Sequence, residues 1–210
     1  MKHSGLQGLL LAAGASTRLG QPKQIVIYQG LSLITRQTRL LLKQCQYVTI
    51  VLGANADLCR RTLEAELLDH ELAAIELIEN QNWATGLGSS IAFGAAHFDR
   101  TYRGILLLLV DQWQLTDQHL RHFVKHWHAC AYVKPSNICI ASMQQEKLVT
   151  GPPVIFSEQF IDELSQFNAS DGAKSLIKRY SEQVFDYPIP QAFTDLDTAE
   201  QLQVLRASDS

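Results

Sequence analysis

Short apolar runs of strand length alternate with segments of helical periodicity along most of this chain. The clearest run, Ile105 to Val110, is apolar at every position, which is typical of a parallel strand covered on both faces. The alternation predicts a three-layer, doubly wound α/β fold with a mostly parallel sheet of the Rossmann-like kind. We expect strands at 8–11, 25–28, 47–52, 75–78, 104–110, 137–143, 153–156 and 184–187, and helices at 33–42, 56–68, 89–98, 116–128, 158–166, 172–180 and 198–205.

The bulk properties favour a single cytoplasmic domain spanning residues 1–210. There is no repeat, low-complexity tract or long linker, and 210 residues can bury a substantial core. The formal charge of -3 gives no general attraction to nucleic acid or to an anionic membrane. No apolar run reaches the length of a membrane span, and the N-terminus lacks the apolar core of a signal peptide.

Cysteine and histidine spacings do not indicate a metal site. The cysteines form no C-x-x-C pair, so we expect reduced, partly buried thiols. The histidines at 119, 122 and 126 share one face of the helix at 116–128, but no cysteine or carboxylate partner is evident, and a polar, wet face is expected there. The four cysteines are Cys45, Cys59, Cys130 and Cys139.

The stretch Leu9 to Lys23, LLLAAGASTRLGQPK, passes from a strand into small residues and then a polar turn. Small residues let the backbone approach a ligand, and its N–H groups can face an anion beneath Arg18 and Lys23. We therefore expect residues 12–23, called the anion loop below, to bind a triphosphate. It is not a Walker loop, because no Lys-Ser or Lys-Thr follows the last glycine. An ordinary strand-to-helix turn with incidental basic residues is the alternative.

Asp111 follows the apolar strand at 104–110 directly. Ligands of open parallel sheets bind at the carboxyl ends of the strands, and Mg²⁺ usually takes one or two carboxylates plus substrate phosphates. The position therefore predicts a Mg²⁺ ligand, although a turn cap is the simpler alternative.

The pattern L-A-A-G-x-S-x-R-x-G-x-x-K resembles the signature of nucleotidyltransferases with a nucleotide-diphospho-sugar-transferase fold, and most closely that of molybdenum cofactor cytidylyltransferases. The resemblance runs from about Leu9 to about Leu205. It implies catalytic roles for Arg18, Lys23 and Asp111, and it favours CTP because a second alanine, Ala13, accompanies pyrimidine nucleotides in related enzymes. The implied nucleotide-binding residues are Leu11, Ala12, Ala13, Gly14, Ser16, Gly86, Ser89 and Ser90, of which Ser89 or Ser90 could also cap the following helix.

Two motifs depart from the family pattern. Trp113 stands where Asp-Gln-Pro or Asp-Met-Pro carries proline, which leaves the shape of the loop and the acceptor pocket open. The closing motif FTDLDTAEQL resembles D-x-D-T-P-E-D-L. We expect only one of its two carboxylates to reach the metal, Asp197 in preference to Asp195, while an ordinary helix start is the alternative.

The resemblance implies an acceptor site for a pterin with a terminal phosphate. Gln112, Pro153 and Lys174 are the expected contacts, with Gly172 opening a helix whose N-terminus suits an anion. A solvated helix start is the alternative for this last segment. Trp83 and Trp127 could stack on a base, but we expect Trp127 to be buried.

The implied reaction is Mg²⁺-dependent transfer of CMP from CTP to molybdopterin or molybdenum cofactor, with release of pyrophosphate and a molybdoenzyme as a client. A sibling enzyme with another nucleotide or phosphorylated acceptor is one alternative. A non-catalytic molybdenum cofactor carrier is the other, although a carrier does not need a triphosphate-binding loop.

Overall fold

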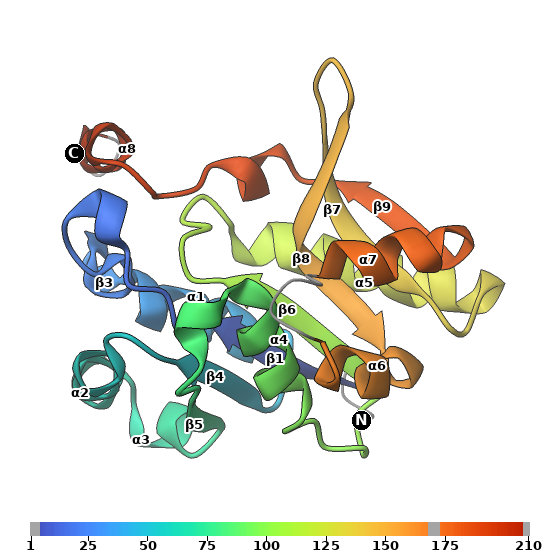
Figure 1. Ribbon diagram of the computed structural model, residues 1–210, viewed down its shortest axis with the longest axis horizontal. Helices are drawn as coiled ribbons and strands as arrows, with labels where there is room; N and C mark the ends of the chain where they lie inside the picture. Colours follow the sequence, from blue (N-terminus) through green and yellow to red (C-terminus); the bar gives the residue numbers. More distant parts are fainter. Residues whose placement is uncertain (1–4, 168–172, 208–210) are drawn as a thin grey trace.

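The computed structural model describes residues 5–167 and 173–207, and its centre is a seven-stranded sheet in the order β5-β4-β1-β6-β8-β7-β9 (Figure 1). All neighbouring pairs are parallel except those of β8, which is antiparallel to both β6 and β7. The expected mostly parallel sheet is confirmed. The strands are β1 Leu6–Leu11, β4 Val48–Leu52, β5 Ile75–Glu79, β6 Gly104–Leu109, β7 Ile138–Gln144, β8 Leu148–Ser157 and β9 Val184–Pro188, with β2 Ile27–Tyr28 and β3 Leu31–Ser32 as a separate antiparallel pair.

The helices occur where the periodicity predicts them, and the short α3 is an addition. The α-helices are α1 Leu33–Leu42, α2 Ala56–Glu66, α3 Asp69–Leu72, α4 Leu87–Ala95, α5 Asp117–Val133, α6 Ile161–Ser165, α7 Ala173–Arg179 and α8 Ala199–Ala207. Short 3₁₀ turns are η1 Thr17–Leu19, η2 Lys23–Ile25, η3 Trp83–Thr85, η4 Glu158–Phe160, η5 Ser181–Gln183 and η6 Pro190–Phe193. No helix among the described residues combines the length and the apolar character needed to cross a membrane.

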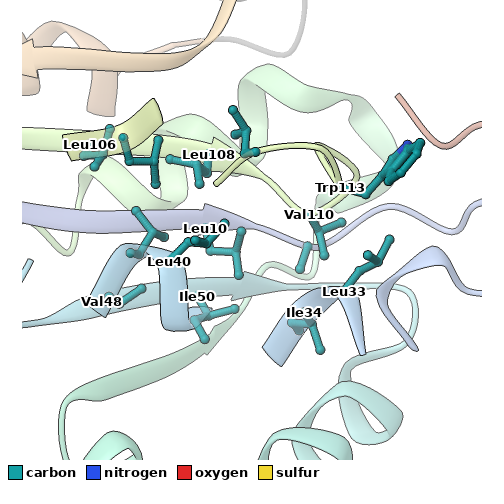
Figure 2. Close-up of a cluster of buried hydrophobic side chains, with 14 of the residues drawn as sticks. Leu10, Leu33, Ile34, Leu40, Val48, Ile50, Leu106, Leu108, Val110 and Trp113 are labelled. Carbon is teal, nitrogen blue, oxygen red and sulfur yellow. The ribbon is translucent and has the colours of Figure 1, made fainter. Parts of the chain in front are cut away.

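The sheet separates two hydrophobic cores, because successive residues of its apolar strands point to opposite faces. Leu10, Leu106 and Leu108 lie in the core that Figure 2 shows in part, which is covered by α1, α2, α5 and α8. Leu9 and Leu107 lie in the other core, under α4, α6 and α7. This is the three-layer arrangement that the fully apolar strands require.

The expected cap of α4 is wrong, because its N-cap is Gly86 instead of Ser89 or Ser90. The helix starts earlier than its polar residues suggest, so Ser89 lies in the first turn and its hydroxyl donates to the carbonyl oxygen of Gly86.

One edge of the sheet brings the conspicuous sequence motifs together. Leu11 pairs with Leu109 in parallel, so β1 and β6 release the anion loop and Asp111 side by side. The chain after β9 returns towards this edge, where α8 contacts η1 of the anion loop (Figure 1). Three segments far apart in sequence therefore meet at the carboxyl ends of the parallel strands.

Candidate active site

Lys23 is the centre of a charged cluster at this edge. Its Nζ lies 2.5 Å from Oδ2 of Asp111 and 3.0 Å from Oδ1 of Asp197. The exposed Arg18 reaches the same cluster, with Nη2 3.1 Å from Oδ2 of Asp197. The structure thus unites the anion loop, the end of β6 and the closing motif, as the resemblance implied.

The anion loop is held in shape by hydrogen bonds from Lys23 and from Gln24, the residue that follows it. The amide of the buried Gln24 donates to the carbonyl oxygens of Ala12 and Gly14, both at 2.8 Å. The backbone N–H of Lys23 donates to the hydroxyl of Ser16, which has a left-handed backbone with φ 55°. Gln24 was not among the residues predicted from the sequence, in which its one distinguishing feature is its position next to Lys23.

Gly14 leaves space on the ligand side of the loop. A Cβ atom built on it would meet no other atom within 4 Å, so packing within the protein does not require glycine there. The residue instead borders a cavity, where a missing side chain lets a bound anion approach the backbone.

This cavity, of about 300 Å³, lies between the anion loop, the end of β6 and the start of α4. Lys23 and Asp111 lie on its wall together with the partly buried Trp83. Five of the expected nucleotide-binding residues line it: Leu11, Ala13, Gly14, Gly86 and Ser90. The other three hold the surrounding structure, since Ala12 packs in the core, Ser16 binds the Lys23 backbone and Ser89 donates to the carbonyls of Asn82 and Gly86.

The cluster shifts the pKa values of its own members. Burial disfavours the ammonium form of Lys23, but the ion pairs with Asp111 and Asp197 outweigh it and raise the lysine pKa. For Asp195, burial and the nearby charges of Asp111 and Asp197 raise the pKa to about 6, with Lys23 opposing the shift. The carboxylate of Asp195 is therefore close enough to Asp111 and Asp197 for their charges to disfavour its ionisation, and such a group of carboxylates is complementary to a cation.

The donor set fits a hard divalent cation. Oδ1 of Asp111 is buried and has no hydrogen-bond partner among residues 5–167 and 173–207, which is costly for a carboxylate oxygen unless something else binds it. Oxygen ligands are those that Mg²⁺ and Mn²⁺ prefer, and the carboxylates of Asp195 and Asp197 are close to that of Asp111. Asp197, the preferred carboxylate of the closing motif, contacts Lys23 directly, whereas Asp195 is close enough for the charges of Asp111 and Asp197 to affect its pKa. Residues two apart in an extended segment share a face, so the two carboxylates can lie on the same side of the segment.

The acceptor residues expected from the resemblance are placed differently from one another. Gln112 is buried, and its amide donates to the carbonyl oxygens of Pro152 and Ala192 while its Oε1 accepts the N–H of Leu109. Its side chain therefore joins β6 to two later segments and has no donor left for a ligand. Trp113 packs edge-to-face on Tyr28 with ring centroids 5.1 Å apart, so the residue in place of proline fills the core.

A second cavity, of about 680 Å³, adjoins the first at Leu87 and has mostly apolar walls. Lys174 lines it as expected, and Lys178 does so as well. Pro152 contributes to the wall, whereas the expected Pro153 is not among the lining residues. Gly172, also expected here, lies outside the described residues. Trp127 is buried, as predicted.

Comparison with known proteins identifies relatives of this arrangement. Residues 8–184 match the family described as MobA-like NTP transferase domain. A curated relative, nicotine blue oxidoreductase from Paenarthrobacter nicotinovorans, is 41% identical over 110 residues, which cover 50% of this chain and 48% of the relative. The alignment thus spans about half the length of that protein.

Solved structures share the fold at low identity. Rv0371c from Mycobacterium tuberculosis H37Rv, in complex with manganese, is 22% identical with a TM-score of 0.72, covering 97% of this chain and 98% of that one. A nucleotidyl transferase from Methanothermobacter (Mth528) is 14% identical with a TM-score of 0.75, covering 97% and 96%. Both alignments extend over nearly the whole of each chain.

Proposed function

The chain belongs to the MobA-like NTP transferase domain family, and from that premise we propose that it transfers CMP from CTP to the terminal phosphate of molybdopterin or the molybdenum cofactor, releasing pyrophosphate. The observation that carries the proposal is the contact between Lys23 and Asp111 on the wall of the nucleotide-sized cavity. Cationic side chains neutralise the charge of a triphosphate, and carboxylates hold a hard metal cation. The cluster contains both kinds of side chain.

Little covalent chemistry is asked of the protein in this reaction. A phosphate oxygen of the acceptor attacks the α-phosphorus of CTP, a new P–O bond forms, and the α–β bond breaks so that pyrophosphate leaves with the electron pair. The acceptor phosphate is already largely ionised near neutral pH, so no side chain has to remove a proton. The chain's task is to hold the two substrates in line and to neutralise charge.

Arg18 and Lys23 are suited to the phosphates. Both are paired with carboxylates, and a triphosphate in the cavity offers Lys23 an alternative anionic partner. The N–H groups of the anion loop, kept in place by Gln24, add neutral donors. Release of Lys23 from Asp111 leaves that carboxylate free for a cation.

Asp111, with Asp195 and Asp197, would hold Mg²⁺. The orphaned Oδ1 of Asp111 supports this assignment, and a fold relative binds manganese. When bound, the ion supplies electrostatic stabilisation to the phosphates as negative charge develops on the leaving group.

The choice of CTP and of a pterin acceptor depends on the two cavities. The methyl group of Ala13 lies on the wall of the smaller one and narrows the space beside a base, which favours a pyrimidine. The larger cavity has apolar walls of Ile91, Val154 and Phe156 that suit a flat heterocycle, with Lys174 and Lys178 available to an anionic group.

A nucleotide panel tests the proposal. The protein is incubated with Mg²⁺, molybdopterin and CTP, GTP, UTP or ATP in turn, and pyrophosphate is measured. We expect CTP to be preferred, and Lys23→Ala and Asp111→Ala each to lower turnover by about 10²–10⁴-fold with the fold intact by circular dichroism. Lys147→Ala, which removes an exposed lysine elsewhere, is the matched control and should be fully active. Normal turnover of CTP by the Lys23 and Asp111 variants would overturn the assignment, and preference for another nucleotide would identify a sibling transferase.

The similarity to nicotine blue oxidoreductase makes an oxidoreductase the second candidate. The apolar cavity could admit an aromatic dye, but reduction would also require a reduced cofactor as hydride donor. Consumption of a reduced nicotinamide cofactor in the presence of such a dye, without pyrophosphate release from any nucleotide, would favour this candidate. Tight pterin binding with neither activity would favour a carrier.

A further inference from the structure

His126, Cys130 and Cys139 converge at a place unrelated to the cavities described above. The two cysteines and the histidine each offer one ligand atom, and the three atoms lie within 4.8 Å of one another. Nε2 of His126 is 3.5 Å from Sγ of Cys130. Zinc bonds of about 2.3 Å to sulfur and about 2.0 Å to nitrogen place tetrahedral ligands roughly 3.5 Å apart, so this pair already has the required spacing.

The fold, more than the local sequence, creates this cluster. His126 and Cys130 are four residues apart on α5 and therefore share a helix face, while Cys139 comes from β7, against which α5 packs. The thiols are free and buried, as expected, but His126 lies beside two of them, so the expectation that this histidine lacks a cysteine partner is wrong. The i,i+4 spacing was visible in the sequence, but the third ligand was not.

The surroundings are suited to a bound ion. Cys139 is fully buried and Cys130 nearly so, whereas His126 is half-buried and leaves a path to solvent. The ring of Tyr187 packs on the imidazole at 5.0 Å between centroids and limits its movement. Burial raises the pKa of both thiols, so without a cation they remain protonated, and a metal must displace those protons.

The cluster is also remote from the transfer chemistry. Cys139 is the second residue of β7, and β7 runs in the same direction as β6, which ends just before Asp111. The cluster therefore lies towards the amino ends of these strands, whereas Asp111 lies beyond the carboxyl end of β6. An ion here would join the last turns of α5 to the start of β7 across the connection 134–137.

We propose that His126, Cys130 and Cys139 bind one Zn²⁺ ion through three protein ligands, with the fourth coordination position taken by water. Thiolate and imidazole are the ligand types that zinc prefers, in contrast to the oxygen-only donor set at Asp111. The ion stabilises the packing of α5 on β7 and takes no part in nucleotide chemistry.

Cobalt substitution tests the site directly. The full-length protein, reduced and freed of metal with a chelator, is titrated with Co²⁺ and its absorption spectrum is recorded. We expect one equivalent to give thiolate-to-cobalt charge transfer and tetrahedral ligand-field bands, both abolished by added Zn²⁺. Co²⁺ bound at the carboxylates around Asp111 gives no thiolate band, so the spectrum separates the two sites.

Matched variants locate the ligands. Cys130→Ser and Cys139→Ser should lose the charge-transfer band, whereas Cys45→Ser and Cys59→Ser, which remove the other two buried free thiols, should keep it. His126→Ala retains both thiols on a folded chain and should weaken Zn²⁺ binding by about tenfold or more. A wild-type protein without the band, a band unchanged in the Cys130 and Cys139 variants, or an isolated Cys130–Cys139 disulfide that excludes metal would overturn the proposal.

Discussion

At the scale of single residues, Lys23 decides the electrostatics of the candidate active site. Its ammonium group forms ion pairs with Asp111 and Asp197 and compensates their charge. Asp195 has no such contact in the described structure, and its burial, together with the charges of Asp111 and Asp197, raises its pKa to about 6. A carboxylate that the fold holds where its charged form is disfavoured is expected to bind a ligand.

Asp195→Asn should stabilise the metal-free protein near pH 8 by about 1–2 kcal/mol, after allowance for solvent screening. Because the folded-state pKa is raised above the ordinary 3.8, the fold binds the proton more tightly than the unfolded chain does. The stability of the wild type therefore falls as the pH rises from about 4 through about 6, and the variant should lack this fall. Denaturant unfolding at about pH 4 and pH 8 in the presence of a chelator measures it.

The matched control is Asp197→Asn, which removes ion pairs with Arg18 and Lys23 and should not stabilise the chain at either pH. Equal stability of the wild type and the Asp195 variant at about pH 8 would contradict the view that burial and neighbouring charges disfavour the ionised form of Asp195. With Mn²⁺ added, the wild type should become more stable than the Asp195 variant, because the variant would lack one of the proposed metal ligands.

At the scale of elements, β6 and β8 pair antiparallel in a sheet that is otherwise mostly parallel, and their backbones lie in close contact. Gly104 pairs with Ser157, and a Cβ atom at Gly104 would lie 2.4 Å from the carbonyl oxygen of Phe156. Backbone of a neighbouring strand cannot move aside as a flexible side chain can. Glycine at this position is therefore a packing requirement of the sheet.

Gly104→Ala should destabilise the fold by about 1–3 kcal/mol, since this clash exceeds the roughly 0.5–1 kcal/mol that alanine gains over glycine in a strand. Gly14→Ala is the control, because its Cβ meets nothing within 4 Å, and its unfolding free energy should change by less than about 0.5 kcal/mol. The two variants should also separate in function: Gly14→Ala should weaken nucleotide binding in calorimetry, and Gly104→Ala should not. Equal stability of the two would refute the packing argument.

At the scale of the whole molecule, the candidate active site joins segments that are far apart in the sequence. The anion loop, the end of β6 and the segment before α8 come from the beginning, middle and end of the sequence, and they meet through side-chain ion pairs. A cation held by Asp111, Asp195 and Asp197 would strengthen the contact between the end of β6 and the segment before α8.

Hydrogen exchange should therefore slow on addition of Mg²⁺ or Mn²⁺ in two distant stretches, around residues 109–113 and 194–202. A cation at a hundred times its dissociation constant adds about 2.7 kcal/mol to the folded state, enough for a clear rise in the melting temperature. Asp111→Ala should abolish both effects. Protection confined to one stretch, or unaffected by this substitution, would show that the ion does not bridge them.

Local patterns in the sequence determined the layers, the helices to within a few residues and the position of the site. Apolar periodicity indicates which residues are buried, and the end of a strand can be located from the residues of that strand alone. Thus Lys23, Arg18 and Asp111 could be named in advance, and the structure places them together.

Only the tertiary structure decided which side chains face a ligand and which hold the scaffold. Gln112 bonds to distant backbone, Trp113 packs on Tyr28, Gln24 anchors the anion loop, and Cys139 joins a pair of residues on α5. Each of these contacts joins residues whose relative position depends on the course of loops and on the single reversed strand β8. Such information is spread over the whole chain, because a side chain's partner is chosen by packing, whereas its tendency to be buried is carried by the residue itself.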